Sequence, residues 1–189
     1  MTWAEMRAEV KVVNTQLGWW DKPVRFKTAM ALLHEEVSEA LQAWRKWEFA
    51  DMTGDCHHES ASDLSHKPEG FGSELADCLI RLLDDDERFA LNLGDWWHPG
   101  DLTRGRFAVW QDLPDNLDDL HNDISWASMM WDSSMCDVDV AHNRGLTPLA
   151  DFLTRLVQIA NLYGVDLEDE YRRKLEYNKT REYRHGKAV

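Results

Sequence analysis

Several common sequence features are scarce in this chain, and each absence narrows its class. Only three cysteines occur, Cys56, Cys78 and Cys136, and their wide spacing implies no disulfide framework. No apolar run approaches the ~20 residues that a membrane-spanning helix needs. The first residues, MTWAEMRAEV, fit an amphipathic helix and not a signal peptide. From these absences we expect a cytoplasmic protein.

Basic residues are also in short supply. The chain has 21 Lys and Arg against 35 Asp and Glu, which gives a formal charge of -14. Because nucleic acid phosphates and anionic lipids repel such a chain, we expect neither a nucleic acid nor a membrane as its partner. Apolar residues make up 43% of the 189 positions, enough for one well-buried domain that covers residues 1–189.

The apolar residues recur with helical spacing, and strand signals are few, so we expect an all-α fold. Residues 51–72 are rich in Gly, Ser, Asp and His and predict a long loop. Residues 94–115 predict a connector that contains a short turn. Gly164 and Asp166 mark the end of one helix and the cap of the next. The helical stripes are Met30, Leu33, Val37, Ala40, Trp44 and Trp47, then Leu75, Leu79 and Leu82.

The second half of the chain repeats part of the first. LHEEVSEALQAW at 33–44 aligns without gaps on LHNDISWASMMW at 120–131, and LADCLIRLL at 75–83 aligns on LADFLTRLV at 149–157. Two matches in the same order indicate a duplicated helical hairpin. We predict a four-helix core from an active hairpin at about 26–93 and a degenerate hairpin at about 116–164. A helical extension precedes this core, and a helix with a basic tail follows it at 165–189.

Two acidic motifs in the first hairpin have the same spacing. HEEVSEA carries Glu36 and Glu39, and SELADCL carries Glu74 and Asp77. Residues three apart share one face of a helix, about 5–6 Å apart at Cβ, so two such helices side by side make a box of four carboxylates. Oxygen ligands of this kind suit Mg²⁺ or Mn²⁺ and do not suit zinc. The same spacing fits a solvated acidic helix face equally well, although these acids flank the apolar seam.

The second hairpin has lost most of these acids, so we expect it to contribute packing and not a metal site. It could still form a wall of a substrate pocket. At the aligned positions Glu36 becomes Asp123, Glu39 becomes Trp126, Glu74 becomes Pro148, and Asp77 persists as Asp151.

Weaker signals point to other ligands. The run Cys56, His57 and His58, with His66, invites a zinc interpretation, but no partner pair occurs at zinc spacing. A nucleobase could stack on tryptophan, although core packing suits those on the apolar stripe better. The candidates are Trp19, Trp20, Trp44, Trp47 and Trp126.

The motifs together resemble a known family. EEVSE at 35–39 followed by ELAD at 74–77 resembles the EExxE and ExxD signature of the MazG-like, all-α nucleotide pyrophosphohydrolases, which include the dimeric dUTPases and dCTP pyrophosphatases. KLEYNKTREYRHG at 174–186 resembles their C-terminal KxxxN and Arg-rich stretch, most closely that of phage and actinobacterial members. With NTQLGWWD near the N-terminus, the resemblance covers nearly the whole chain. The departure is the second hairpin, inserted before the C-terminal helix.

The resemblance implies a function. A MazG-like chain would hydrolyse a nucleoside triphosphate to the monophosphate and pyrophosphate, through a metal-activated water at the α-phosphorus. A phage-encoded protein would act in the host cytoplasm. A homodimer or higher homo-oligomer is implied, with a pseudo-dimeric monomer as the alternative because the hairpin is duplicated. The resemblance implies that Mg²⁺, or Mn²⁺ in its place, is bound by Glu36, Glu39, Glu74 and Asp77. The general base that accepts the proton of the attacking water would be Glu39 or Glu35. The implied substrate contacts are Lys174, Asn178, Arg181 and Arg184.

Two other classes compete with this hypothesis. An acidic, non-enzymatic interaction or inhibitor protein would use the charge of -14 directly and would lose binding in salt. A di-iron four-helix protein also uses carboxylates from facing helices, but the ExxH pairing expected there is absent.

Overall fold

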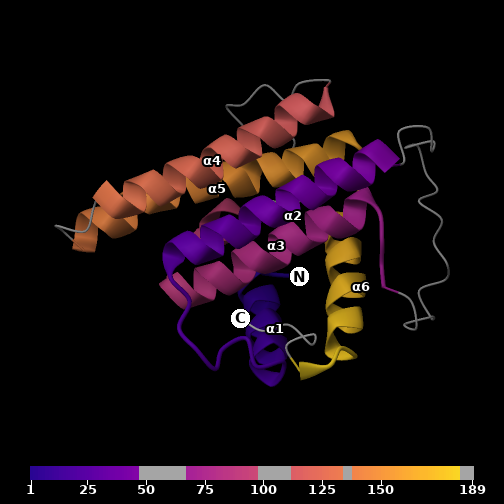
Figure 1. Cartoon of the computed structure of the whole chain (residues 1–189), viewed down its shortest axis with the longest axis horizontal. Coiled ribbons are helices and arrows are strands. Elements are labelled where there is room, and N and C mark those ends of the chain that lie inside the picture. Colours follow the sequence, from indigo (N-terminus) through magenta and orange to yellow (C-terminus); the bar gives the residue numbers. More distant parts are fainter. Residues whose placement is uncertain (47–66, 98–111, 134–137, 184–189) are drawn as a thin grey trace.

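The computed structural model describes residues 1–46, 67–97, 112–133 and 138–183, and every regular element in them is helical (Figure 1). This confirms the all-α fold class. No helix in these ranges is both long enough and apolar enough to cross a membrane. The elements are α1 (Trp3–Gln16), α2 (Phe26–Lys46), α3 (Phe71–Phe89), the 3₁₀ turn η1 (Leu93–Trp96), α4 (Leu113–Ser133), α5 (Val138–Leu162) and α6 (Leu167–Lys179).

The two aligned segments form two helical hairpins that pack against each other. Helix α2 packs on α3, α4 packs on α5, and the hairpins meet mainly through α2 and α4, with a smaller contact between α3 and α5. Figure 1 shows these four helices running side by side, with α1 and α6 crossing beneath α3. Helix α3 is therefore covered by neighbours on several sides.

Burial repeats between the hairpins in the way the alignment predicts. Leu33 and Val37 of α2 are fully buried, and so are their counterparts Leu120 and Ile124 of α4. Apolar residues three and four apart form one face of each helix, and burying these faces stabilises the pair. The aligned apolar positions of α3 and α5 are likewise buried: Leu75 and Leu149, Leu79 and Leu153, Leu82 and Leu156.

Equivalent residues also touch across the α2–α4 contact. His34 Nδ1 lies 2.8 Å from His121 Nδ1, and the two rings stack with centroids 5.0 Å apart. The Ser38 hydroxyl donates to the His34 carbonyl, and the Ser125 hydroxyl donates to the His121 carbonyl in the same way. A residue that meets its own aligned counterpart marks an approximate two-fold relation between the hairpins.

Some boundaries differ from those predicted. Helix α3 begins at Phe71, inside the predicted loop 51–72, and α4 begins at Leu113, inside the predicted connector 94–115. Phe71 and Leu113 are both buried, so tertiary packing extends each helix into a segment of weak propensity. Helix α5 runs through Pro148, which lacks the backbone N–H that an interior helical position donates. Most of the loop, with Cys56, His57, His58 and His66, lies outside the described residues, and so does Trp47.

Capping fixes the first and last helices. The Thr2 side chain accepts from the Glu5 N–H and the Glu5 carboxylate accepts from the Thr2 N–H, which forms a capping box at α1. Asp166 caps α6 by accepting from the Asp169 N–H, and Gly164 adopts a left-handed φ of 68° just before it. Both predictions for the turn before the last helix are confirmed.

Three consecutive aspartates near the end of α3 have different surroundings. Asp86 accepts from the indole of Trp3, and Asp84 accepts from Trp20 and Arg88, so both tie the N-terminal segment to α3. Asp85 is also buried, but its Oδ2 has no hydrogen-bond partner. Burial, together with the charge of Asp84, raises the pKa of Asp85 to about 8.

The substitution Asp85→Asn tests this burial. The folded protein keeps a proton on Asp85 up to a pKa of about 8, whereas the unfolded chain releases it near the ordinary value of 3.8. The carboxyl therefore lowers stability progressively as pH rises between these two values, and the cost is constant above them. The asparagine stays neutral. We expect Asp85→Asn to be more stable than the parent by about 1–3 kcal/mol at pH 9, with the advantage shrinking toward pH 5, in urea unfolding. Asp84→Asn should destabilise the protein at both pH values, and a pH-independent effect of Asp85→Asn would contradict the assignment.

Candidate metal centre

Three of the predicted acids converge between α2 and α3. Glu36 and Glu39 lie one turn apart on α2, and Glu74 faces them from the first turn of α3. One carboxylate oxygen of each lies within 4.8 Å of the other two. Within the described part of the chain, no other three acidic, histidine or cysteine side chains converge in this way.

The donor set fits a hard divalent cation. Oxygen ligands of Mg²⁺ at ~2.1 Å stand roughly 3 to 4 Å apart, so modest torsion changes bring the three carboxylates to that spacing. Glu36 and Glu74 are buried, with 9% and 7% exposure, while Glu39 lies nearer to solvent. Three carboxylates do not fill the shell of a six-coordinate cation, so water or substrate oxygens would complete it. The cluster lacks the nitrogen and sulfur ligands that zinc prefers.

The fourth predicted ligand, Asp77, pairs with a lysine of the last helix. Lys174 Nζ lies 2.7 Å from Asp77 Oδ2 and 3.9 Å from Glu74 Oε2. The ammonium also donates to the Ser73 hydroxyl at 2.9 Å and to the Pro68 carbonyl at 3.4 Å. Lys174 is only 1% exposed, so this cation is a buried counter-ion of the acidic cluster. Helix α6 is thereby linked to the acidic cluster through a lysine that the sequence analysis expected to contact a substrate.

An arginine supplies the second counter-ion. Arg81 lies one helical turn beyond Asp77 on α3, and its Nε donates to Glu36 Oε1 at 2.9 Å. Sequence reasoning did not single out Arg81, nor Ser73, which accepts from Lys174. The four-residue spacing from Asp77 to Arg81 was the available signal, because it places both on one face of the helix.

Burial shifts the acids of the cluster toward their protonated forms. It raises the pKa of Glu36, with Arg81 opposing the shift. It raises the pKa of Glu74 to about 7, against the attraction of Lys174 and with the repulsion of Asp77. Carboxylates crowded together in a poorly hydrated site need protons or cations, and a divalent ion would displace the proton.

The remaining predicted site residues have different surroundings. Glu35 is on the exposed surface of α2. Asn178 lies one turn beyond Lys174 on α6, and its Oδ1 is buried without a hydrogen-bond partner. Arg181 follows the end of α6, with its guanidinium 5.8 Å from the centre of the Tyr177 ring. Arg184 lies outside the described residues.

The tryptophan candidates are mostly engaged in structural contacts. Trp20 donates to Asp84 and stacks under the Arg88 guanidinium, 4.3 Å from its ring centre. Trp19 and Trp44 pack against the core, whereas Trp126, at the position aligned with Glu39, is exposed on α4. Among the candidates that the structure describes, Trp126 has the most exposed side chain.

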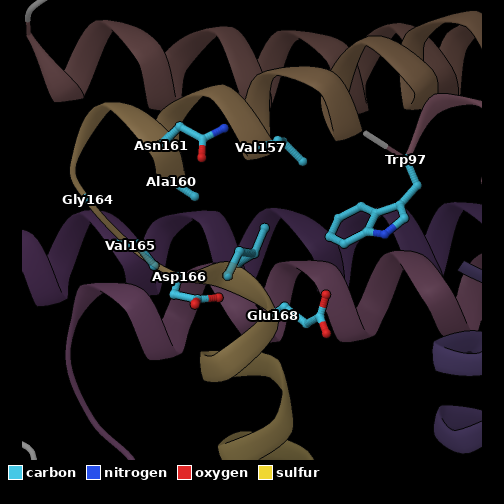
Figure 2. Close-up of a pocket in the computed structure, with 9 residues that line it drawn as sticks. Trp97, Val157, Ala160, Asn161, Gly164, Val165, Asp166 and Glu168 are labelled. Atoms are coloured by element: carbon cyan, nitrogen blue, oxygen red, sulfur yellow. The ribbon is translucent and has the colours of Figure 1, made fainter. Parts of the chain in front are cut away.

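A separate cavity of about 370 Å³ lies between the end of α5 and the start of α6 (Figure 2). Val157 and Trp97 form part of its wall, and Asp166 and Glu168 line its α6 side. The Glu168 carboxylate pairs with the terminal amine of Met1 at 2.7 Å. None of the predicted site residues lines this cavity, so it is distinct from the carboxylate cluster.

Comparisons of the chain with protein-family models, curated proteins and solved structures find no match. Functional inference therefore rests on the geometry of the cluster and on the motif resemblance.

The pH dependence of metal binding tests the cluster. Because Glu74 must lose a proton at a pKa of about 7, we expect Mn²⁺ affinity, measured by calorimetry, to rise about tenfold per pH unit below pH 7 and to level off above it. Glu74→Gln should bind at least about tenfold more weakly at pH 8 and lose most of this dependence.

Asp123→Asn is the matched control. Burial raises the pKa of Asp123 to about 7 as well, yet this acid lies in the second hairpin, outside the cluster. Its substitution should leave both the Mn²⁺ affinity and its pH dependence unchanged. Equal binding by Glu74→Gln and the parent would contradict the assignment.

Proposed function

We propose that the protein is a Mg²⁺-dependent nucleoside triphosphate pyrophosphohydrolase with a MazG-like core. The observation that carries the proposal is the convergence of Glu36, Glu39 and Glu74 within 4.8 Å, because these are positions of the EExxE-like and ExxD-like motifs. Two motifs 30 or more residues apart in the sequence thus share one cluster, with hard oxygen ligands that suit the Mg²⁺ of a triphosphate.

The position of the last helix supports the same proposal. Lys174, the first residue of the KxxxN-like stretch, reaches Asp77 at 2.7 Å, so the third motif also lies at the cluster. Because Lys174 is buried and paired, its role in this proposal is to fix the position of the Asp77 carboxylate through their ion pair. Contact with the triphosphate then falls to Asn178, Arg181 and Arg184. Guanidinium groups offer paired donors to phosphate oxygens, and an amide offers a neutral contact.

In the proposed reaction a water oxygen attacks the α-phosphorus and the bond from that phosphorus to the oxygen bridging it to the β-phosphorus breaks. The products are the nucleoside monophosphate and pyrophosphate. The bound Mg²⁺ supplies charge neutralisation and a lowered water pKa. Glu39, the most open acid of the cluster, accepts the water's proton, with Glu35 on the adjacent surface as the second candidate. Arg181 stabilises charge on the departing pyrophosphate.

Pyrophosphate release tests this function. The purified protein with Mg²⁺ is assayed on ribo-, deoxyribo- and modified nucleoside triphosphates. We expect release from a subset of these substrates, and a loss of more than about 100-fold in kcat/KM for Glu39→Gln and for Asp77→Asn, about 2.7 kcal/mol of transition-state stabilisation.

Asp151→Asn is the control, because Asp151 aligns with Asp77 in the second hairpin. Its activity should stay within about twofold of the parent. Absence of release from every substrate, together with absence of Mg²⁺ binding, would contradict the proposal and favour an acidic interaction protein.

A further inference from the structure

Arg81 lies between the acidic cluster and a second group of acids on α3. Its Nε donates to Glu36 Oε1 at 2.9 Å, and the carboxyls of Asp85 and Asp84 also attract its guanidinium electrostatically. Burial alone would lower the pKa of Arg81, but the attraction of these acids raises it, so the side chain stays charged. The guanidinium is therefore a permanent cation fixed against one member of the cluster.

The contact engages one of the two oxygens of Glu36. A carboxylate whose Oε1 accepts from Arg81 still has Oε2 available for a cation held jointly with Glu39 and Glu74. The Nε–H of arginine has a fixed direction in the plane of the guanidinium. Its hydrogen bond therefore restricts the rotation of the carboxylate, in addition to balancing the negative charge. Partners behind a metal ligand orient it in this way and affect metal affinity.

The second hairpin contains the same contact without the cluster. Arg155 aligns with Arg81, and Asp123 aligns with Glu36. Arg155 Nε donates to Asp123 Oδ2 at 3.0 Å, and its Nη1 donates to Asp119 Oδ2 at 2.8 Å. The positions aligned with Glu39 and Glu74 hold Trp126 and Pro148, which offer no carboxylate.

The two arginines therefore share one task and differ in another. Each neutralises a carboxylate on the helix it faces, α2 for Arg81 and α4 for Arg155, and so stabilises its own hairpin. Arg155 is bound by two acids, while Arg81 pairs with an acid that belongs to a three-carboxylate group. Comparing the two positions separates stabilisation of a hairpin from orientation of a metal ligand.

We infer that Arg81 is a positioning residue that orients the Glu36 carboxylate for metal binding, whereas Arg155 stabilises the second hairpin alone. This inference rests on the metal site of the proposed function. It predicts that Arg81 acts through the direction of its Nε–H and not through its charge alone. Lysine at position 81 keeps the charge and loses that direction.

The test compares Arg81→Lys and Arg81→Gln with Arg155→Lys and Arg155→Gln in the full-length protein. Mg²⁺ and Mn²⁺ affinities are measured by calorimetry, and stability is measured by urea unfolding. We expect both Arg81 variants to lose about 10–100-fold in metal affinity, with Arg81→Lys nearer to Arg81→Gln than to the parent. Both Arg155 variants should keep metal affinity within about twofold of the parent while unfolding at lower urea concentration.

The outcomes separate the inference from the proposed function. Folded Arg81 variants with parental metal affinity would overturn the inference while the parent still binds metal. Parental affinity of Arg81→Lys, with loss only in Arg81→Gln, would show that charge suffices and would also overturn it. A parent protein that binds neither Mg²⁺ nor Mn²⁺ would instead remove the proposed function. If Arg81→Gln fails to fold, Arg81→Lys against Arg155→Lys carries the comparison.

Discussion

The need to neutralise buried carboxylates between α2 and α3 determines much of this structure. Glu36 and Glu74 point into the seam between two apolar helix faces, where ionised acids are poorly hydrated and repel one another. Two cationic side chains from different helices neutralise part of this negative charge. Arg81 comes from α3 itself, while Lys174 comes from α6, nearly 100 residues later in the sequence. A divalent ion bound by Glu36, Glu39 and Glu74 would neutralise these carboxylates further.

The cluster ties the last helix of the chain to α3. Lys174 holds Asp77, and three residues earlier on α6 the buried Tyr171 hydroxyl donates to the Met6 carbonyl of α1. Helix α1 is in turn joined to α3 through the contact of Trp3 with Asp86. The first and last helices thus pack against the same helix that carries Glu74 and Asp77, so residues from both α1 and α6 support the acidic cluster.

The two hairpins show how one scaffold can hold different chemistry. The contact between His34 and His121 and the repeated burial of aligned leucines describe the same packing twice. An acid paired to an arginine is also present twice. What differs is the presence of further carboxylates beside that pair, which forms the three-carboxylate cluster in the first hairpin and leaves an ion pair without such a cluster in the second.

Periodic features of the sequence predicted the helices and the convergence of three of the four acids, whereas Asp77 pairs with Lys174. Spacings of three and four residues fix which side chains share a helix face, and this is enough to bring Glu36 and Glu39 toward Glu74. Residue spacing within one helix does not predict contacts that depend on how another helix packs against it. The burial of Lys174 follows from how α6 crosses α3, and the starts of α3 and α4 follow from the packing of Phe71 and Leu113.

Anomalous X-ray scattering from crystals grown with Mn²⁺ tests the central claim most directly. The account predicts an anomalous peak between α2 and α3, about 2.1–2.3 Å from carboxylate oxygens of Glu36, Glu39 and Glu74, with Arg81 retained on the far oxygen of Glu36. It also predicts no such peak beside Asp123 in the second hairpin. A fully occupied Mn²⁺ elsewhere, with none among these three glutamates, would contradict the account.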